Sequence, residues 1–262
     1  MNRTTVLGLA MATLVALSAC APPVEQFDPE EHFVVHVIAG GDAVEIFRYI
    51  GGRTEVRIPP TIQNLPVLAI GFSAFARTGI TEVSIPDSVI IIGEEAFTRN
   101  QLTAVTIPDS VVHIGAAAFQ ANHISYLAIS NSLITIENFA FAQNSLNTLS
   151  IPDSVTHIGE RAFWFNQLAE VDIPNSVTYI GNAAFWINQL ADVTIPDSVS
   201  YIGVGAFAGN WLTNLTIEDG ASHIGEGAFA RNRLTDVFIP DSVTYIGDRA
   251  FDDDVRVTRG AN

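Results

Sequence analysis

Residues 151–172 read Ile-Pro-Asp-Ser-Val-Thr-His-Ile-Gly-Glu-Arg-Ala-Phe-Trp-Phe-Asn-Gln-Leu-Ala-Glu-Val-Asp, and this 22-residue pattern organises most of the chain. The same motif opens again at Ile85, Ile107, Ile173, Ile195 and Ile239. Its Ala-Phe pair recurs nine times at constant spacing, with the phenylalanines at Phe75, Phe97, Phe119, Phe141, Phe163, Phe185, Phe207, Phe229 and Phe251. A fixed period of this length is typical of stacked repeats. The sequence therefore predicts a mainly β solenoid of nine coils over residues 58–251.

Within each coil the apolar residues keep fixed positions that favour two short strands. In one coil, Leu102-x-x-Val105-x-Ile107 has the spacing of a first strand, and Val111-x-x-Ile114 predicts a second. Equal coil lengths place equivalent strands above one another, which predicts two narrow parallel sheets. One coil is too small to bury its own apolar residues, so the coils must be stabilised by stacking.

A polar column accompanies the apolar ones. Asparagine recurs at Asn100, Asn122, Asn144, Asn166, Asn188, Asn210 and Asn232. Its amide can donate and accept hydrogen bonds at once, so seven asparagines in register predict a ladder that ties coil to coil. The Asp-Ser pairs of the Ile-Pro-Asp-Ser turns are expected to cap local backbone groups.

The strand spacing Leu-x-x-Val-x-Ile, the following Ile-Pro, and Val-x-x-Ile-Gly-x-x-Ala-Phe together resemble the BspA-like, or treponemal-type, leucine-rich repeats. The resemblance extends from about Phe33 to the C-terminus. Asparagine fills the column where that family often has cysteine. The resemblance implies a non-catalytic surface lipoprotein that takes part in adhesion or binds extracellular proteins or polysaccharides.

The two ends of the array depart from the repeat. Residues 32–57 predict a β cap, with strands at 33–38, 44–50 and 54–58 separated by glycine-rich breaks, as in a β-meander. The first coil has five extra residues near Asn64-Leu65-Pro66, where we expect a surface bulge. Residues 252–262 predict a C-terminal cap or tail, because three aspartates follow Phe251 and Arg256 falls in the column of a core leucine.

The N-terminus has the features of an export signal. Arg3 precedes an apolar run from Val6 to Ala16, which is too short to span a bilayer as a helix. The run ends in Leu-Ser-Ala-Cys20, which resembles a bacterial lipobox. It predicts a signal peptide over residues 1–19, lipidation of Cys20 and a tether over residues 20–31. The protein would then be exported and lipid-anchored to the bacterial envelope, with Ala21 resembling the outer-membrane sorting pattern. The alternative is an ordinary signal peptide with an incidental cysteine.

Composition excludes several functions. The formal net charge is −16, and all 12 basic residues are arginine. Nucleic acids and anionic lipids both require cationic contacts, so neither is an expected partner. Cys20 is the single cysteine, which excludes an internal disulfide, a CxxC pair and a cysteine-based zinc site. No cofactor is predicted.

Two segments contain the residue types of a hydrolase triad: Asp109-Ser110 with His113, and Asp153-Ser154 with His157. The turn itself accounts for Asp-Ser, and nothing supplies a strained nucleophile elbow or an oxyanion hole. We therefore predict no enzymatic activity. The histidines belong to an outward column in which no two occupy adjacent coils, so this column is not a zinc site. Its members are Ile91, His113, Thr135, His157, Tyr179, Tyr201, His223 and Tyr245.

The three tryptophans of the chain fall within about three coils. Exposed aromatic clusters bind sugar rings or apolar patches of a partner. The candidate patch comprises Trp164, Phe165, Trp186, Ile187, Trp211, Tyr179 and Tyr201. The alternative is that these side chains pack over a neighbouring loop. Glu170, Asp172 and Asp192 form a candidate acidic face, for which a solvated surface is favoured over a calcium site because no loop completes the ligand shell.

These features predict an exported, lipid-anchored leucine-rich-repeat protein that binds a protein or polysaccharide ligand. The alternative function is a periplasmic or envelope scaffold without a specific external ligand. The sequence leaves open the identity of the ligand, the oligomeric state and the membrane face that the protein occupies.

Overall fold

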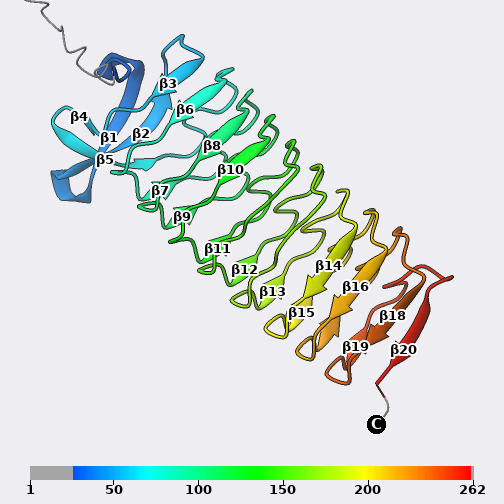
Figure 1. Cartoon of the computed structure of the whole chain (residues 1–262). Coiled ribbons are helices and arrows are strands. Elements are labelled where there is room, and N and C mark those ends of the chain that lie inside the picture. Colours follow the sequence, from blue (N-terminus) through cyan, green and yellow to red (C-terminus); the bar gives the residue numbers. More distant parts are fainter. Residues whose placement is uncertain (1–25, 261–262) are drawn as a thin grey trace, which may run out of the picture.

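A computed structural model describes residues 26–260. The predicted signal peptide and the lipidation site Cys20 lie outside this range. The described chain forms an elongated stack of coils that runs from the N-terminal hairpin to the C-terminal strand (Figure 1). The predicted mainly β solenoid is confirmed, with about ten turns of about 22 residues. Within the described residues, no helix is long and apolar enough to cross a membrane.

Every complete coil has three sides. On the first, which we call the long-strand face, strands of three or four residues pair in parallel. These strands are β3 (Glu55–Arg57), β6 (Glu82–Ser84), β8 (Ala104–Thr106), β10 (Tyr126–Ala128), β14 (Asp192–Ile195), β16 (Asn214–Ile217), β18 (Asp236–Ile239) and β20 (Arg256–Arg259). The predicted single sheet on this face is instead four two-stranded parallel sheets, β3–β6, β8–β10, β14–β16 and β18–β20. Between β10 and β14 one isolated bridge joins Ser150 to Asp172.

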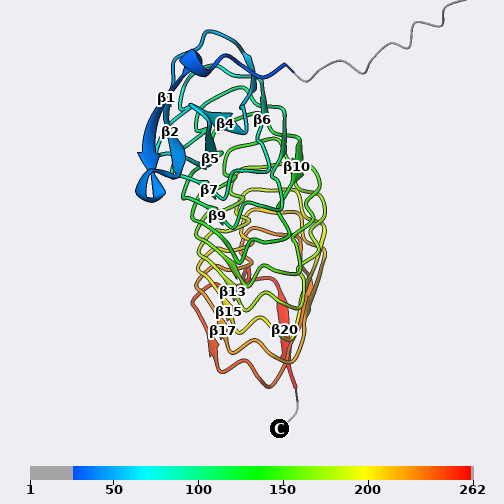
Figure 2. The same ribbon diagram turned by 90° about the vertical axis from the view of Figure 1, so that its left-hand side faces the viewer.

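The second side, the short-strand face, carries parallel strands of two residues each. They are β7 (Ile91–Ile92), β9 (His113–Ile114), β11 (Thr135–Ile136), β12 (His157–Ile158), β13 (Tyr179–Ile180), β15 (Tyr201–Ile202), β17 (His223–Ile224) and β19 (Tyr245–Ile246). The third side contains the Ala-Phe turns. Figure 2 shows the coils piled on one another in a view along a different direction.

The Ala-Phe turns build the centre of the core. Eight of the nine repeat phenylalanines are less than 2% exposed, and Phe251 at the C-terminal end is 8% exposed. Successive rings stack with centroids 4.9–5.8 Å apart. At the N-terminal end Tyr49 continues the stack, 5.2 Å from Phe75. Because the coils have equal lengths, phenylalanines at the same repeat position form one continuous stack of rings through the core, which we call the phenylalanine spine.

The predicted asparagine ladder is confirmed. The Nδ2 atom of Asn122 donates to the carbonyls of Phe97 and Phe119, at 3.0 and 3.2 Å, and its Oδ1 atom accepts from the amide of Leu102 at 3.1 Å. Each asparagine therefore bonds its own coil and the preceding one. Because these backbone groups are buried, the bonds replace water that cannot reach them.

The N-terminal cap differs in part from the prediction. Two of its expected strands, β1 (Phe33–Ile38) and β2 (Ala43–Tyr49), form an antiparallel hairpin. The third expected strand is β3, which pairs in parallel with β6 and so belongs to the long-strand face. Short 3₁₀ turns, η1 (Glu30–His32) and η2 (Ala39–Gly41), precede β1 and join it to β2.

The predicted surface bulge of the first coil is a second hairpin. Strand β4 (Thr61–Ile62) pairs antiparallel with β5 (Leu65–Ile70), and β5 continues in parallel with β7. Gln63 and Asn64 connect β4 to β5 and both have left-handed φ angles, 56° and 62°. Two successive positive φ angles fit the right-handed twist of a two-residue hairpin loop, so the extra residues pair with one another instead of bulging outward.

The predicted tether is wrong for its last residues. Asp28 is 4% exposed, its amide donates to the Arg57 carbonyl, and its carboxylate accepts from the Arg57 amide. Asp28 therefore covers the open edge of β3. Nearby, a carboxylate oxygen of Glu30 accepts from the amide of Gln63. Any free tether ends before Asp28.

Two further expectations need correction. Arg256 does not interrupt the core, because the last coil is two residues shorter and Arg256 pairs beside Asp236 on the exposed side of β20. The serines expected to cap the turns mostly do not: the hydroxyls of Ser88, Ser110, Ser154, Ser176 and Ser242 have no hydrogen-bond partner among the described residues. The turns are held instead by backbone bonds such as the one from the Val111 amide to the Pro108 carbonyl.

Candidate binding surfaces

The centre of the predicted aromatic patch is a pair of indoles on the Ala-Phe turn side. Trp164 and Trp186 follow the buried phenylalanines of adjacent coils, so their rings stack with centroids 5.9 Å apart and planes 14° apart. Both are half-buried, and the neighbouring Phe165 is 53% exposed. The Arg161 guanidinium lies 6.0 Å from the centroid of Trp164, within the range of a cation–π contact.

A groove of about 570 Å³ opens beside Trp186. In the next two coils alanine takes the place of tryptophan. The small side chains of Ala208 and Ala230 therefore form the floor of the groove, and the larger indole of Trp186 forms one of its walls. Glu160, Arg161, Glu226 and Arg231 also line the groove. An aromatic wall, a small-residue floor and charged side chains of both signs suit a ligand with one flat apolar face and polar edges. In the sequence, this groove is indicated by the change from tryptophan to alanine at the same repeat position in successive coils.

Trp211 occupies a different column of the repeat. It is 45% exposed, and the guanidinium of Arg233 from the next coil lies 5.1 Å from its ring centroid. No aromatic contact joins Trp211 to the indole pair in the part of the chain that the structure describes. The backbone at Gly209 lies against the indole pair, since a Cβ atom there would be 3.6 Å from the Trp186 ring.

Tyr179 and Tyr201 belong to the short-strand face, where they are part of a separate aromatic column. Ring centroids in this column are 4.4–5.9 Å apart, in the order His157, Tyr179, Tyr201, His223 and Tyr245. The rings cover one another's faces, so mainly edges and hydroxyls remain for solvent. Burial, then the neighbouring Tyr201 and Glu160, raise the pKa of Tyr179. The predicted aromatic patch is therefore three separate groups: the indole pair with Phe165, Trp211 alone, and the two tyrosines.

The predicted acidic residues come together on the long-strand face. Glu170, Asp172 and Asp192 line one groove of about 430 Å³. Across residues 26–260, no three acidic, histidine or cysteine side chains are grouped closely enough to hold a metal ion. All three side chains are exposed, and a solvated acidic surface stays the prediction for them.

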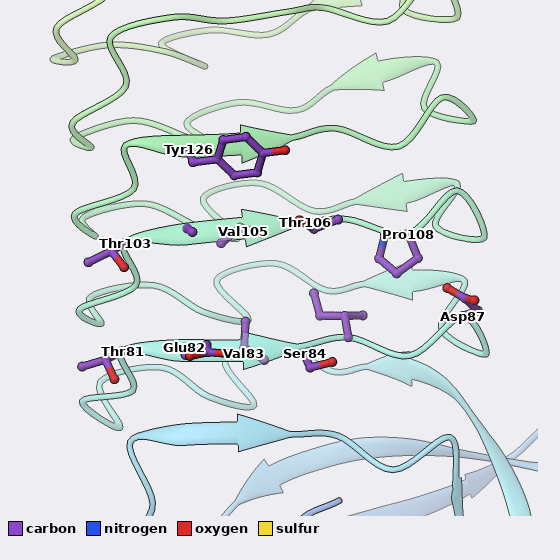
Figure 3. Close-up of a pocket in the computed structure, with 12 residues that line it drawn as sticks. Thr81, Glu82, Val83, Ser84, Asp87, Thr103, Val105, Thr106, Pro108 and Tyr126 are labelled. Carbon is purple, nitrogen blue, oxygen red and sulfur yellow. The ribbon is translucent and has the colours of Figure 1, made fainter. Parts of the chain in front are cut away.

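Sequence inspection missed an exposed aromatic residue on the same face. Tyr126 on β10 is 60% exposed and lines two grooves, one of about 620 Å³ and one of about 460 Å³. Figure 3 shows its ring over β10, with the strands that carry Thr106 and Ser84 following one after the other along the stack. The available signal was a lone tyrosine in a column that otherwise holds small or charged residues.

The triad residue types do not assemble. The hydroxyls of Ser110 and Ser154 are buried and bond to no histidine in the described structure. Asp109 instead accepts from the backbone and side-chain amides of Asn131. The Nδ1 atom of His157 lies 2.7 Å from the hydroxyl of its neighbour Thr156. Among the described residues, Asp109 and His157 therefore bond to other neighbours and not to the serines of the predicted triads.

The repeated parallel strands and the continuous core define the class: this is a leucine-rich-repeat solenoid. The model of the BspA type leucine-rich repeat region matches residues 68–191 and 180–258 in six copies. The chain belongs to this family. Proteins of this repeat class are typically non-enzymatic binding proteins, and family membership supports an interaction module.

Solved structures agree with this fold. The leucine-rich-repeat protein of T. pallidum is similar at 28% identity with a TM-score of 0.54, over 79% of this chain and 89% of that one. A leucine-rich cell surface protein of Faecalibacterium prausnitzii is similar at 24% identity with a TM-score of 0.51, over 90% of this chain and 88% of that one. The pneumococcal vaccine antigen PcpA is similar at 19% identity with a TM-score of 0.50, over 87% and 79%. No curated protein sequence matches the chain significantly.

Proposed function

We propose that this protein is exported, lipid-anchored through Cys20, and binds a protein or polysaccharide partner at the bacterial cell envelope. The observation that carries the proposal is the half-buried indole pair Trp164–Trp186 with the groove beside it. A stack of indoles that only served the core would be covered on all sides. Here the adjoining Phe165 and Ile187 are 53% and 37% exposed, which leaves an apolar surface open to solvent.

The surroundings of the indole pair suit recognition. The cation of Arg161 lies near the Trp164 ring, and it also forms an ion pair with Glu160 at 2.9 Å. Aromatic and arginine side chains are the residues that most often dominate binding energy at interfaces. The solenoid holds them on a rigid backbone, so little ordering would be needed on binding.

Export is supported by the lipobox-like sequence at the N-terminus and by the description of the F. prausnitzii protein as a cell surface protein. The long array would then present its faces to molecules outside the cytoplasm. If the protein instead remained inside the periplasm as a scaffold, it would need no open aromatic surface.

The binding site is tested by screening a glycan and matrix-protein array with the wild-type chain and with Trp186→Ala. We expect at least one ligand whose signal falls at least about tenfold in the variant, because loss of one stacking contact of about 1.4 kcal/mol is a tenfold loss of affinity. Trp211→Ala is the matched control, since it removes an exposed indole outside the groove. Equal binding by wild type and Trp186→Ala across the array would remove the proposed site.

Anchoring and exposure need their own measurements. Metabolic labelling with a fatty-acid analogue is expected to mark the wild-type chain and not Cys20→Ala. Protease added to whole cells is expected to cleave an externally exposed protein, whereas complete protection with intact labelling would favour the periplasmic scaffold.

A further inference from the structure

A second candidate site lies on the long-strand face, away from the indole pair. The outward column there holds Glu82, Ala104, Tyr126, Thr148 and Glu170 in successive coils, so one large ring stands between an alanine and a threonine. Tyr126 is 60% exposed. In Figure 3 its ring lies along β10 and is seen nearly face-on.

Two grooves meet at this ring. The first, of about 620 Å³, has Ser84, Ala104 and Thr106 among its lining residues. The second, of about 460 Å³, has Ala128, Thr148 and Ser150. Tyr126 is the one residue that lines both, so the two grooves lie on either side of the phenol ring, and together we call them the trough. A ligand lying along the solenoid axis would have to pass over that ring.

The lining chemistry selects the class of ligand. Small side chains leave the floor shallow, and hydroxyls of serine and threonine provide donors and acceptors at its sides. Glu82 and Asp87 add carboxylates, and no arginine is among the residues that line either groove. With a formal net charge of −16, the protein also repels polyanions at long range.

From this geometry we propose that the trough binds a non-acidic glycan that runs along the solenoid axis, with one sugar ring stacked on Tyr126. A sugar ring has an apolar face of C–H groups that matches an open aromatic face, and its equatorial hydroxyls match the serine and threonine hydroxyls around the trough. The site shares no residue with the indole groove, so its test does not depend on the outcome of the test of the proposed function.

A peptide is a poorer match to the same surface. Peptides that add to a sheet bond to an unpaired strand edge, whereas the trough lies over the face of the strands and presents side chains. The exposed residues of the lining are mostly small or polar, among them Ser84, Thr106 and Ser150. The lining residues Val83, Val105 and Leu149 are buried, so they offer little apolar surface to the side chains of a partner.

The test is isothermal titration of the full-length chain with four probes: cellohexaose, a chitosan hexamer, hexagalacturonate and hexalysine. We expect binding of cellohexaose or the chitosan hexamer. Tyr126→Ala should weaken that binding at least about tenfold, and Tyr126→Trp should keep it within about threefold. Phe238→Ala is the matched control, because Phe238 is an exposed aromatic of the same face that lines neither groove.

Three results would overturn the proposal. They are binding of neither non-acidic hexamer by the wild-type chain, binding of only hexagalacturonate or only hexalysine, and unchanged affinity in Tyr126→Ala. Hydrogen exchange of the Asn122 side-chain network and of β10 would establish that each variant is folded. Because Tyr126 is mostly exposed, its replacement should leave the core intact.

Discussion

The coil that contains Glu137 and the next coil, which contains Gly159, have the same length but pair differently with the coil before them. The amide of Gly159 donates to the Ile136 carbonyl at 2.8 Å, and β12 pairs with β11. At Glu137 the equivalent bond to the Ile114 carbonyl is missing among the described backbone bonds, and β11 does not pair with β9. The short-strand face is therefore split in two at this point.

The glycine column explains the split. A Cβ atom at Gly115 would lie 2.4 Å from the Glu94 amide nitrogen, and one at Gly159 would lie 2.7 Å from the Asn138 amide nitrogen. Only glycine allows the backbones of adjacent coils to come so close. Glu137 carries a Cβ atom, so its coil has to stand further from the preceding one. The absence of one Cβ atom per coil therefore sets the distance at which the short strands can pair.

The asparagine ladder shows why the array survives this defect. Around the split, Asn144 still donates to the Phe119 and Phe141 carbonyls at 3.0 and 3.1 Å. The Ala-Phe turns also remain joined, since the Phe119 amide donates to the Ala140 carbonyl. The coil with Glu137 therefore keeps its core hydrogen bonds to the preceding coil and loses only the pairing on the short-strand face.

The largest effect is expected when a regular coil receives the glutamate that Glu137 places in the glycine column. In Gly181→Glu the new Cβ atom would lie 2.7 Å from the Glu160 amide nitrogen and from the Gly159 carbonyl carbon. We expect β13 to separate from β12 and two backbone bonds to be lost, with a decrease of about 3–5 kcal/mol in the free energy of unfolding. Urea unfolding measures this value, and a decrease below about 1 kcal/mol would contradict the steric explanation.

The next effect concerns the ladder that bridges the two regions. Asn166→Ala removes donors to the Phe141 and Phe163 carbonyls and leaves the amide of Leu146 without its partner. The free energy of unfolding should fall by about 2–4 kcal/mol, since these groups are buried. Asn232→Ala is the control at the more exposed C-terminal end, where water can replace the lost bonds and about half the effect is expected. Equal losses at both positions would contradict the role of burial.

The reverse substitution should repair the irregular coil. Glu137→Gly removes the side chain that separates β9 from β11, so the strands can approach and form the missing bonds. We expect a gain of about 1 kcal/mol, because each new bond adds about 0.5–1.5 kcal/mol and the flexible glycine offsets part of it. Hydrogen exchange should slow at residues 134 and 137. Gly115→Ala, which adds a Cβ atom in a regular coil, should lower the free energy of unfolding and speed hydrogen exchange at that coil.

The smallest effect is a dependence of stability on alkaline pH in the aromatic column beyond the split. Burial and the neighbours Tyr201 and Glu160 raise the pKa of Tyr179 above the ordinary tyrosine value of about 10. Above that pH the unfolded chain loses its phenolic proton before the folded one does, so stability falls as the pH rises from about 10 through the folded pKa. Tyr179→Phe should flatten this loss. Absorbance titration of the phenolate, compared between wild type and variant, gives the folded pKa directly.

The sequence already contained the regular part of this protein. A constant period of 22 residues places like side chains in vertical columns, so the phenylalanine spine, the asparagine ladder and the parallel strands could all be predicted by counting. The residue Glu137 was also visible as an exception in the glycine column. Its consequence needed the tertiary structure, because only the close approach of the neighbouring backbone shows that a Cβ atom does not fit in this column.

The columns alone did not determine which of them share a face. Trp186 and Tyr179 are seven residues apart in one coil, yet a turn places one beside the alanine floor and the other in the stack of the short-strand face. Likewise the hairpin at Gln63 and Asn64 and the shortened last coil reset the register where the repeat stops. Sequence period fixes neighbours along the stack, whereas the bends within a coil fix neighbours around it. Those bends depend on backbone angles and close contacts that only the folded chain reveals.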